Sequence, residues 1–295
     1  MRKRFVVTGH KGFIGSAVVA EILKTEGTGV DIYQTDDDLN DTALLIDLLR
    51  YAKPDYIIHC AGRTEGTREE LDSSNVDATQ SLFAAVRNVG ISPTIVVAGS
   101  ASVYGHMAAM QDKVKEDSNL HASTDYAYSK VWQESICGQF WREGMVVTVA
   151  RIFNVLSTGQ PAHLFPTALI NRLVNTNDRK LMVRGLQHWR DFLDVRDVAS
   201  ALIHIARYGL QPVYNVGSGI GVKVKSIVTA IARAAGINDL EPIDVVGGGV
   251  SRCVADVSRL TALGWTQEHR TGVTLTDMVR DALDARDRAL PLPYE

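Results

Sequence analysis

The chain contains few cysteines and little excess charge, and both absences exclude classes of protein. Cys60, Cys137 and Cys253 are the three cysteines among 295 residues, and none forms a CxxC pair, so neither a disulfide framework nor a zinc site is expected. A net charge of −3 without a basic tract argues against nucleic-acid binding. No apolar run reaches the roughly 20 residues of a membrane span. We therefore expect a cytoplasmic protein with no metal, nucleic-acid or membrane partner.

Apolar, strand-like runs alternate with helical patterns over the first half of the chain. The expected strands are Arg4–Thr8, Val30–Thr35, Tyr56–Cys60, Thr94–Gly99 and Val146–Ile152. The expected helices are Ile14–Thr25, Thr42–Tyr51, Asn75–Val89 and Tyr126–Arg142. Nearly all-apolar strands suit a parallel sheet covered on both faces, and the alternation predicts right-handed βαβ units. The sequence therefore predicts an α/β fold with a doubly wound parallel sheet of the Rossmann type.

A glycine-rich turn joins the first expected strand to the first expected helix. Gly9, Gly12 and Gly15 form a GxxGxxG pattern, and the helix opens with Phe13 and Ile14. Glycine permits a positive φ and lets the backbone approach a pyrophosphate closely, while the helix N-terminus offers N–H groups to the phosphates. A purely structural turn is the alternative reading. The position between a strand and a helix favours a dinucleotide site.

Tyr126 and Lys130 stand four residues apart in DYAYSK, and Ser100 ends an expected strand. On a helix, residues i and i+4 share a face, so the ammonium of Lys130 is expected near the phenol of Tyr126. A nearby cation would lower the pKa of the phenol from about 10 toward working pH, as a general acid–base requires. Ser100 would hydrogen-bond the same substrate oxygen. A surface tyrosine on a helix is the alternative reading for Tyr126.

After Ile152 the regular alternation breaks into shorter segments, which predict a smaller, discontinuous C-terminal lobe. We expect residues 1–155 and 190–218 to form the dinucleotide-binding Rossmann domain. Residues 156–189 and 219–295 are expected to form a substrate-binding lobe. No long linker or internal repeat is visible, so the two lobes are expected to share one cleft.

These motifs, in this order, resemble the extended short-chain dehydrogenases/reductases that modify nucleotide sugars. The resemblance rests on the glycine turn and on HCAG, NVDAT, SASVYG, YAYSK, RIFNV, RDFLDVRDVA and YNVGSG, and it covers nearly the whole chain. It implies NAD or NADP in the first lobe, a nucleoside-diphosphate sugar between the lobes, and a homodimer. GDP-fucose synthases and GDP-6-deoxy-4-keto-hexose reductases are the subgroups that look most similar.

Departures from the family pattern narrow the expected reaction. The family's dehydratases carry an Asp–Glu pair after the catalytic Ser or Thr, whereas this chain has Ala101 and Ser102, so dehydration is disfavoured. Fucose synthases use a cysteine at the position of Ser102 together with a histidine, which His163 matches. A serine hydroxyl is a much weaker base than a thiolate. His163 is equally consistent with a loop residue capping the next helix. Reduction at C4 of the sugar requires the Ser–Tyr–Lys set alone.

The choice of cofactor depends on the end of the second expected strand. Asp36 would bind the adenosine ribose and repel a 2′-phosphate, which favours NAD. Lys11 would pair with that phosphate, which makes NADP the alternative. The resemblance assigns Asp38 and Leu39 to adenine binding. A solvated turn with a helix N-cap at Asp41 accounts equally well for the aspartates.

The resemblance assigns further residues to the two ligands. Ala61, Gly62 and Asn75 match cofactor positions, beside Tyr126 and Lys130. Ser102, Asn154, Arg190, Arg252 and Asp256 match positions that contact the sugar nucleotide. Arginine suits a diphosphate because its planar fork bonds two oxygens at once. Ordinary surface ion pairs are the alternative reading for the two arginines.

The leading hypothesis is a nucleotide-sugar 4-ketoreductase. A 4-epimerase uses the same residues but keeps NAD bound and regenerates it, and it is the alternative. A catalytically silent, NAD(P)-binding regulatory protein is a third reading from a different class. The intact Ser–Tyr–Lys set weighs against that third reading.

Overall fold

The computed structural model describes residues 2–105, 112–176, 180–245 and 250–289. Its centre is a six-stranded parallel sheet with the strand order β2-β1-β3-β4-β5-β9. The strands are β1 Lys3–Thr8, β2 Val30–Gln34, β3 Tyr56–His59, β4 Thr94–Ser100, β5 Val147–Ile152 and β9 Val213–Val216. This order, with β1 inside the sheet, confirms the predicted doubly wound α/β fold.

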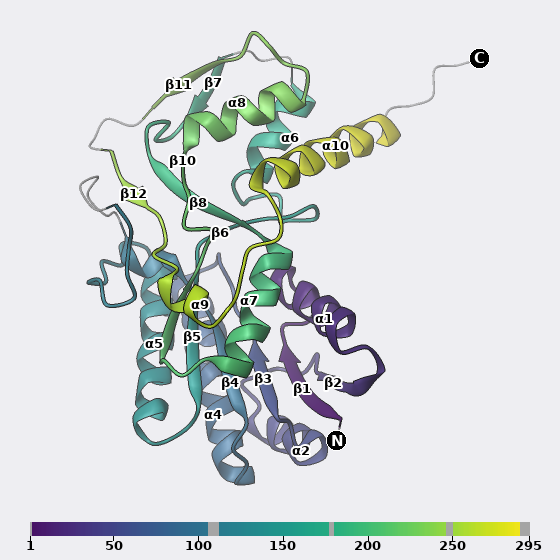
Figure 1. Ribbon diagram of the computed structural model, residues 1–295, viewed down its shortest axis with the longest axis vertical. Helices are drawn as coiled ribbons and strands as arrows, with labels where there is room; N and C mark the ends of the chain where they lie inside the picture. The colour runs from purple at the N-terminus through teal and green to yellow at the C-terminus, as the bar shows by residue number, and fades with distance from the viewer. Residues whose placement is uncertain (1, 106–111, 177–179, 246–249, 290–295) are drawn as a thin grey trace.

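Helices cover both faces of this sheet (Figure 1). One apolar core lies between the sheet and helices α1 Phe13–Glu26 and α7 Val195–Tyr208. A second core lies on the other face, under α2 Thr42–Ala52, α4 Ala78–Val89 and α5 Asp125–Arg142. The strands contribute fully buried residues to both cores, which explains their nearly continuous apolar sequence.

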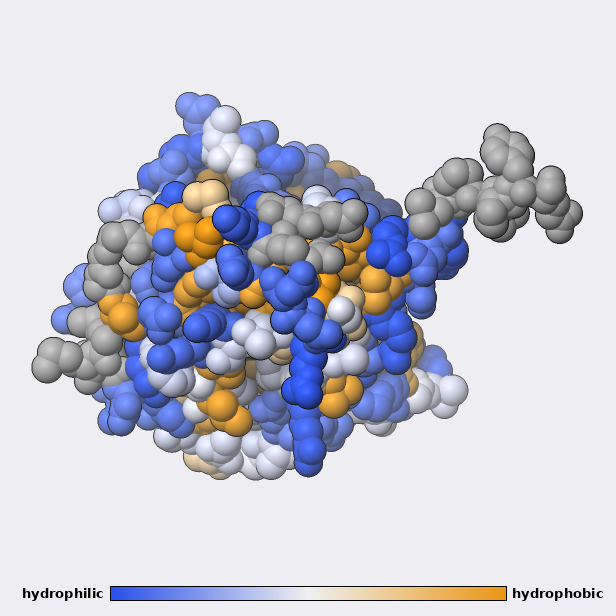
Figure 2. Space-filling view, turned by 90° about the horizontal axis from the view of Figure 1, so that it is seen from above, coloured by the Kyte–Doolittle hydropathy of each residue, from blue (hydrophilic) through white to orange (hydrophobic). Residues whose placement is uncertain are grey.

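A smaller lobe lies beyond the sheet (Figure 1). Its four-stranded sheet consists of β6 Asn154–Leu156, β8 Trp189–Asp194, β10 Gly221–Lys223 and β12 Arg252–Cys253. A two-stranded sheet pairs β7 Lys180–Val183 with β11 Glu241–Asp244. The helices of this lobe are α6 Thr167–Asn175, α8 Val224–Ala234 and α10 Thr271–Ala289, which share a third core. Figure 2 shows this end of the molecule with small hydrophobic groups set between hydrophilic residues.

Two segments depart from the sequence-based expectations. The stretch from Gly62 to Ser73 lies outside the expected helices, yet it contains helix α3 Arg68–Asp72, whose N-terminus is fixed by a capping box of Thr67 and Glu70. A π-helical turn, Ser73–Asp77, then leads into α4, so the expected single helix is interrupted at its start. Helix α3 is stabilised by its capping box and lacks apolar residues at helical spacing, so the hydrophobic pattern did not predict it.

The second departure concerns the assignment of segments to lobes. Helix α9 Ser258–Ala262 was expected in the substrate lobe, yet Leu260 and Trp265 pack into the first core with β1 and α7. Strand β8, expected in the Rossmann domain, pairs within the sheet of the smaller lobe. The division of the chain into two lobes at the expected boundaries stays a prediction. None of the helices in the described ranges is both long and apolar enough to cross a membrane.

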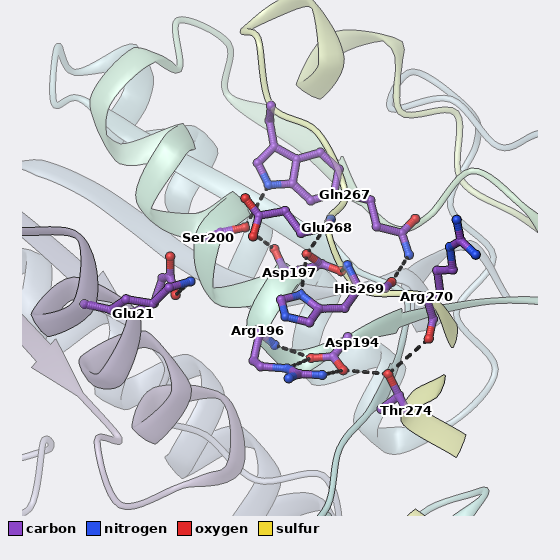
Figure 3. Close-up of polar contacts among 12 residues, drawn as sticks. Glu21, Asp194, Arg196, Asp197, Ser200, Gln267, Glu268, His269, Arg270 and Thr274 are labelled. Atoms are coloured by element: carbon purple, nitrogen blue, oxygen red, sulfur yellow. Dashed lines mark hydrogen bonds and ion pairs between the residues drawn. The ribbon is translucent and has the colours of Figure 1, made fainter. Parts of the chain in front are cut away.

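Buried polar contacts fasten the segment after α9 to α7 (Figure 3). Asp197 is 1% exposed and accepts hydrogen bonds from the backbone N–H groups of Glu268 and His269, both at 2.9 Å. The ring Nδ1 of His269 lies 3.1 Å from the same carboxylate. Trp265 donates from Nε1 to Ser200 on α7 at 3.0 Å. These bonds fix the chain where it leaves the Rossmann sheet for α10.

Asp197→Asn should destabilise the protein by about 1–3 kcal/mol, because an amide nitrogen would replace a buried acceptor that faces N–H donors. Urea unfolding measures the change. Asp47→Asn, at a position on α2 whose side chain is 78% exposed, is the matched control. Its free energy of unfolding should stay within about 0.5 kcal/mol of the parent value. Equal stabilities of the two variants would show that Asp197 does not hold this joint.

Candidate active site

Where β1 leads into α1, two glycines, Gly9 and Gly15, have no room for a side chain. Gly9 has φ 67°, and a Cβ there would lie 2.6 Å from the backbone nitrogen of Ala61. A Cβ on Gly15 would lie 2.1 Å from the carbonyl oxygen of Gly9. Gly12, the N-cap of α1, has no side chain to occupy the first N–H groups of the helix. The turn therefore offers backbone donors and a positive dipole end to a pyrophosphate.

Charged residues meet where this turn faces the end of β2. Lys11 Nζ lies 2.5 Å from Asp36 Oδ2, and His10 Nε2 lies 3.6 Å from Asp36 Oδ1. The Lys11 ammonium lowers the pKa of the Asp36 carboxyl, so that carboxyl stays ionised at neutral pH. Asp36, which favours NAD, and Lys11, which favours NADP, therefore form an ion pair with each other.

The next residues of this segment form a turn and a helix cap. Asp38 accepts from the backbone and side chain of Asn40, and Leu39 packs against the second core. Asp41 caps α2 by accepting from the N–H groups of Ala43 and Leu44 at 2.9 and 3.2 Å. The expected N-cap is confirmed, while adenine binding by Asp38 and Leu39 stays a prediction.

Asn75 has its side chain fully committed to the protein. Its Oδ1 accepts from the backbone N–H of Arg63 at 2.9 Å, and its Nδ2 donates to the carbonyl of Arg63 and to Ser129 Oγ. A Cβ on Gly62 would lie 2.4 Å from Asn75 Oδ1 and 3.5 Å from Lys130 Nζ. Asn75 thus clamps the strand β3 exit onto α5, directly above the Lys130 ammonium.

Ser100 and Tyr126 line one cavity of about 350 Å³ at the carboxyl end of β4. Ser100 terminates β4, and the first turn of α5 carries Tyr126 with Thr124 as its N-cap. The Ser100 hydroxyl lies close enough to the Tyr126 phenol to lower its pKa. Ser100 also accepts from the N–H of Ser102 at 3.1 Å. The structure therefore brings the expected serine and tyrosine together at the expected strand end.

Burial, however, changes the titration expected for this pair. Burial raises the pKa of Tyr126, and the neighbouring Ser100 hydroxyl offsets this shift in part. The expected lowering by Lys130 is wrong for this arrangement of side chains. Lys130 Nζ is instead bonded to the Ala98 carbonyl at 3.1 Å and to Gln133 Oε1 at 2.9 Å. Burial lowers the pKa of Lys130 itself to about 8.

A buried polar network behind Lys130 escaped the sequence analysis. Gln133 is 1% exposed and connects Lys130 to Thr79, which in turn contacts His59. His59 is fully buried with a partner on each ring nitrogen, and burial lowers its pKa to about 3. The available signal was the position of Gln133, three residues after Lys130 and so on the same helical face.

A second network supports the short turn Ala101–Tyr104 beside the cavity. Tyr104 is fully buried and donates from its hydroxyl to Asn215 Oδ1 at 2.7 Å. Arg151 donates to the same hydroxyl at 2.7 Å and pairs with Glu134 on α5. These contacts fix the backbone that carries Ser100 and Ser102.

The expected substrate residues divide between this cavity and a neighbouring hollow. Ser102, Asn154 and Arg190 line the cavity, together with Cys253 from β12. Asn154 donates to the Asp191 carbonyl at 2.7 Å. Burial raises the pKa of Cys253 to about 11, so its thiol is protonated at neutral pH.

Arg252 and Asp256 line the neighbouring hollow of about 620 Å³ with Lys113 and Lys115. The guanidinium of Arg252 stacks over Trp189 at 4.9 Å and donates to the backbone at Asp112. Their expected contact with a nucleotide stays a prediction. The ring of Trp189 thus supports the Arg252 cation.

The structure does not bring His163 into the cavity wall. Its side chain is 40% exposed, and its Nε2 lies 3.7 Å from Glu65 Oε1, across the gap between the two lobes. The expected catalytic role of His163 thus gains no contact with Ser100 or Tyr126 from this geometry. Ser102 contrasts with it, because its Oγ is buried in the cavity region without a hydrogen-bond partner among the described residues.

A glycine turn on a Rossmann sheet and a tyrosine–serine pair at one strand end are typical of dinucleotide-dependent oxidoreductases. The chain belongs to the NAD dependent epimerase/dehydratase family, which matches residues 5–217. It is therefore an NAD(P)-dependent enzyme of the short-chain dehydrogenase/reductase type.

Three similar proteins narrow this class. GDP-6-deoxy-D-mannose reductase of Pseudomonas aeruginosa is 31% identical over 247 residues, covering 80% of this chain and 81% of that protein. GDP-L-fucose synthase of Escherichia coli is 22% identical over 318 residues, covering 97% and 98%. The structure of RMD from Pseudomonas aeruginosa complexed with NADPH has a TM-score of 0.85 and 28% identity, covering 96% and 98%. The expected family is confirmed.

Gly15→Ala should weaken NADH and NADPH binding at least tenfold, because the new methyl group would displace the Gly9 carbonyl and the donors of α1. Titration of cofactor fluorescence measures the affinity. Gly29→Ala is the matched control, since nothing lies within 4 Å of its Cβ position. Undiminished affinity in Gly15→Ala would place the cofactor elsewhere.

Proposed function

We propose that this chain reduces the C4 carbonyl of a nucleoside-diphosphate 4-keto-6-deoxy sugar, with GDP as the favoured nucleotide. The observation that carries the proposal is that Ser100 and Tyr126 line one cavity together with a half-buried arginine, Arg190. The relative at 31% identity, a GDP-6-deoxy-D-mannose reductase, supports the substrate class.

The raised pKa of Tyr126 suits a proton donor. A phenol that stays protonated at neutral pH can deliver its proton to the carbonyl oxygen as negative charge develops there. Ser100 holds the same oxygen by a hydrogen bond. When bound, the nicotinamide cofactor supplies the hydride. The phenolate left behind is stabilised by Ser100, and in this mechanism the Lys130 ammonium, one turn further along α5, turns its remaining donor toward that charge once it forms.

The residues beside Ser100 favour reduction over elimination or epimerisation. Ala101 and Ser102 carry no carboxylate, and the Ser102 hydroxyl is too weak a base to remove a carbon-bound proton at neutral pH. The unpartnered Oγ of Ser102 instead suits a hydrogen bond to a sugar hydroxyl. The expected second acid–base, His163, lies outside this wall.

The diphosphate is assigned to Arg190. Its guanidinium donates to the Trp189 carbonyl at 2.8 Å and to Ser251 Oγ at 3.0 Å, both uncharged acceptors. Within the described ranges no carboxylate pairs with it, and burial lowers its pKa. A half-buried cation without a counter-ion, facing a cavity, favours an anionic ligand.

Cofactor preference is assigned to the Lys11–Asp36 pair. We favour NAD because the ionised Asp36 carboxylate would accept from the ribose hydroxyl and repel a 2′-phosphate. Use of NADP would require Lys11 to leave Asp36 for that phosphate. The 28%-identical RMD structure contains NADPH, so both cofactors belong in every assay.

Tyr126→Phe should lower kcat for reduction of GDP-4-keto-6-deoxymannose at least a hundredfold, because the proton donor is lost. Affinity for NADH should change less than threefold, since the ring is kept. Product analysis of reactions quenched at fixed times measures kcat, and fluorescence titration measures the NADH affinity. Full turnover in the variant would refute the proton-donor role.

An assay without added cofactor distinguishes the reductase from the alternative function, a 4-epimerase. The wild-type chain, incubated with GDP-mannose or UDP-glucose and no added cofactor, should leave the sugar unchanged. Conversion to the C4 epimer without net change in NADH absorbance would identify a 4-epimerase and overturn the reductase.

We also propose a homodimer that forms through α5. Tyr128 and Trp132 lie four residues apart on the outer face of this helix and are 45% and 56% exposed. Large aromatic side chains that share one helix face are typical of a helix–helix interface.

Trp132→Glu should shift the protein from dimer to monomer, because a charge would be buried in the interface. Light scattering after size-exclusion chromatography measures the mass at a fixed concentration. Tyr51→Glu, on α2 and 79% exposed, is the matched control and should leave the mass unchanged. A wild-type monomer, or a dimeric Trp132→Glu variant, would refute this interface.

A further inference from the structure

Five buried polar groups form a chain from the glycine turn to Lys130. Thr8 ends β1 and contacts His59 Nδ1 at 2.7 Å, and His59 Nε2 lies 3.0 Å from Thr79 Oγ1. Gln133 Nε2 donates to Thr79 Oγ1 at 2.8 Å, and Lys130 Nζ donates to Gln133 Oε1 at 2.9 Å. All five are at least 94% buried. Polar side chains in such positions are costly unless each is satisfied.

The proton positions in this chain are determined by its ends. Thr79 spends its hydroxyl proton on the Asn75 carbonyl at 2.8 Å, so it accepts from both His59 Nε2 and Gln133 Nε2. His59 is therefore the neutral Nε2–H tautomer, with Nδ1 accepting from Thr8. Because Gln133 donates with its nitrogen to Thr79, its oxygen must face Lys130. The amide has one orientation, and that orientation presents an acceptor to the ammonium.

This arrangement leaves Lys130 with one donor to spare. An ammonium has three donors, of which the Ala98 carbonyl and Gln133 Oε1 take two. The Nζ lies near Gly62, at the exit of β3, where the cofactor site begins. The charge has no carboxylate partner within the described ranges, so neutral oxygens alone stabilise it. Such a cation depends on the geometry of each acceptor.

The titratable groups around Lys130 do not supply a counter-charge. His59 and Cys60 face it from β3, Cys137 from α5, and Tyr126 stands one turn before it on the same helix. Burial keeps His59 neutral and raises the pKa of the Cys60 thiol to about 12. It also raises the pKa values of Cys137 and Tyr126. At neutral pH all four groups are therefore uncharged.

We propose that Gln133 is the positioning residue for Lys130, holding the ammonium charged beside Gly62 at the edge of the cofactor site. The inference rests on the proposed reductase mechanism, in which the protonated Lys130 stabilises the phenolate. Gln133 acts through Lys130 and touches neither substrate nor cofactor.

Substitution at Gln133 should move the alkaline limb of the kcat–pH profile in two directions. The protonated Lys130 is the active form, so activity falls as pH rises through its pKa, about 8. Gln133→Glu places a carboxylate beside the ammonium and should move this limb up by about one pH unit. Gln133→Leu removes an acceptor and should move it down by a similar amount, with kcat at pH 7 about tenfold lower.

Gln139→Glu and Gln139→Leu, on the exposed face of the same helix, are the matched controls and should leave the limb in place. Thermal melting and NADH affinity verify that each variant is folded. A merely structural role for Gln133 would lower stability without shifting the limb in opposite directions. Coincident limbs in the folded Gln133 variants and the wild type would overturn the proposal.

A measurement without substrate separates this proposal from the proposed function. NMR titration of protein labelled with ¹³C at the lysine side chain follows Lys130 directly, its signal being assigned by its loss in Lys130→Met. The pKa of Lys130 should rise in Gln133→Glu and fall in Gln133→Leu. Unchanged titration would refute the role of Gln133. Shifted titration in an enzyme that reduces no keto-sugar would refute the proposed function alone.

Discussion

The close approach of the backbone at the carboxyl ends of β1, β3 and β4 determines where the glycine turn, Asn75 and Lys130 lie. Gly9 approaches Ala61 so closely that neither the turn nor the strand end tolerates an added atom there. The same crowding places Gly62 against Asn75 and directly over Lys130. A cofactor site, a helix N-terminus and a buried ammonium thus occupy one edge of the sheet because three backbones meet there.

That edge was predictable from the sequence because it follows from the alternation of strands and helices. Parallel strands place their carboxyl ends side by side, so Gly9 and Ser100, far apart in the chain, were expected to converge. The strand order and the packing of α1 against α7 agree with this expectation. The strands are visible in the sequence because burial on both faces of the sheet requires nearly continuous apolar runs.

What the sequence could not supply were contacts that depend on three-dimensional burial. The spacing of Tyr126 and Lys130 is right, but periodicity cannot show that Lys130 prefers the Ala98 carbonyl and Gln133 to the phenol. Likewise Leu260 of α9 packs into the core between the Rossmann sheet and α7, and nothing in the local sequence around Leu260 indicates which lobe it packs against. Helix α3 was missed because a capping box, not a hydrophobic pattern, defines it.

The direction of the pKa shifts also bears on which reaction this site favours. Oxidation of an alcohol needs a base at the start, and burial makes the Tyr126 phenolate harder to form. Reduction needs an acid at the start, and the same burial keeps the phenol protonated until charge develops on the substrate oxygen. In the proposed mechanism the Lys130 ammonium matters after that transfer, when the phenolate must be stabilised. The raised pKa of Tyr126 therefore supports the proposed role of proton donor rather than that of proton acceptor.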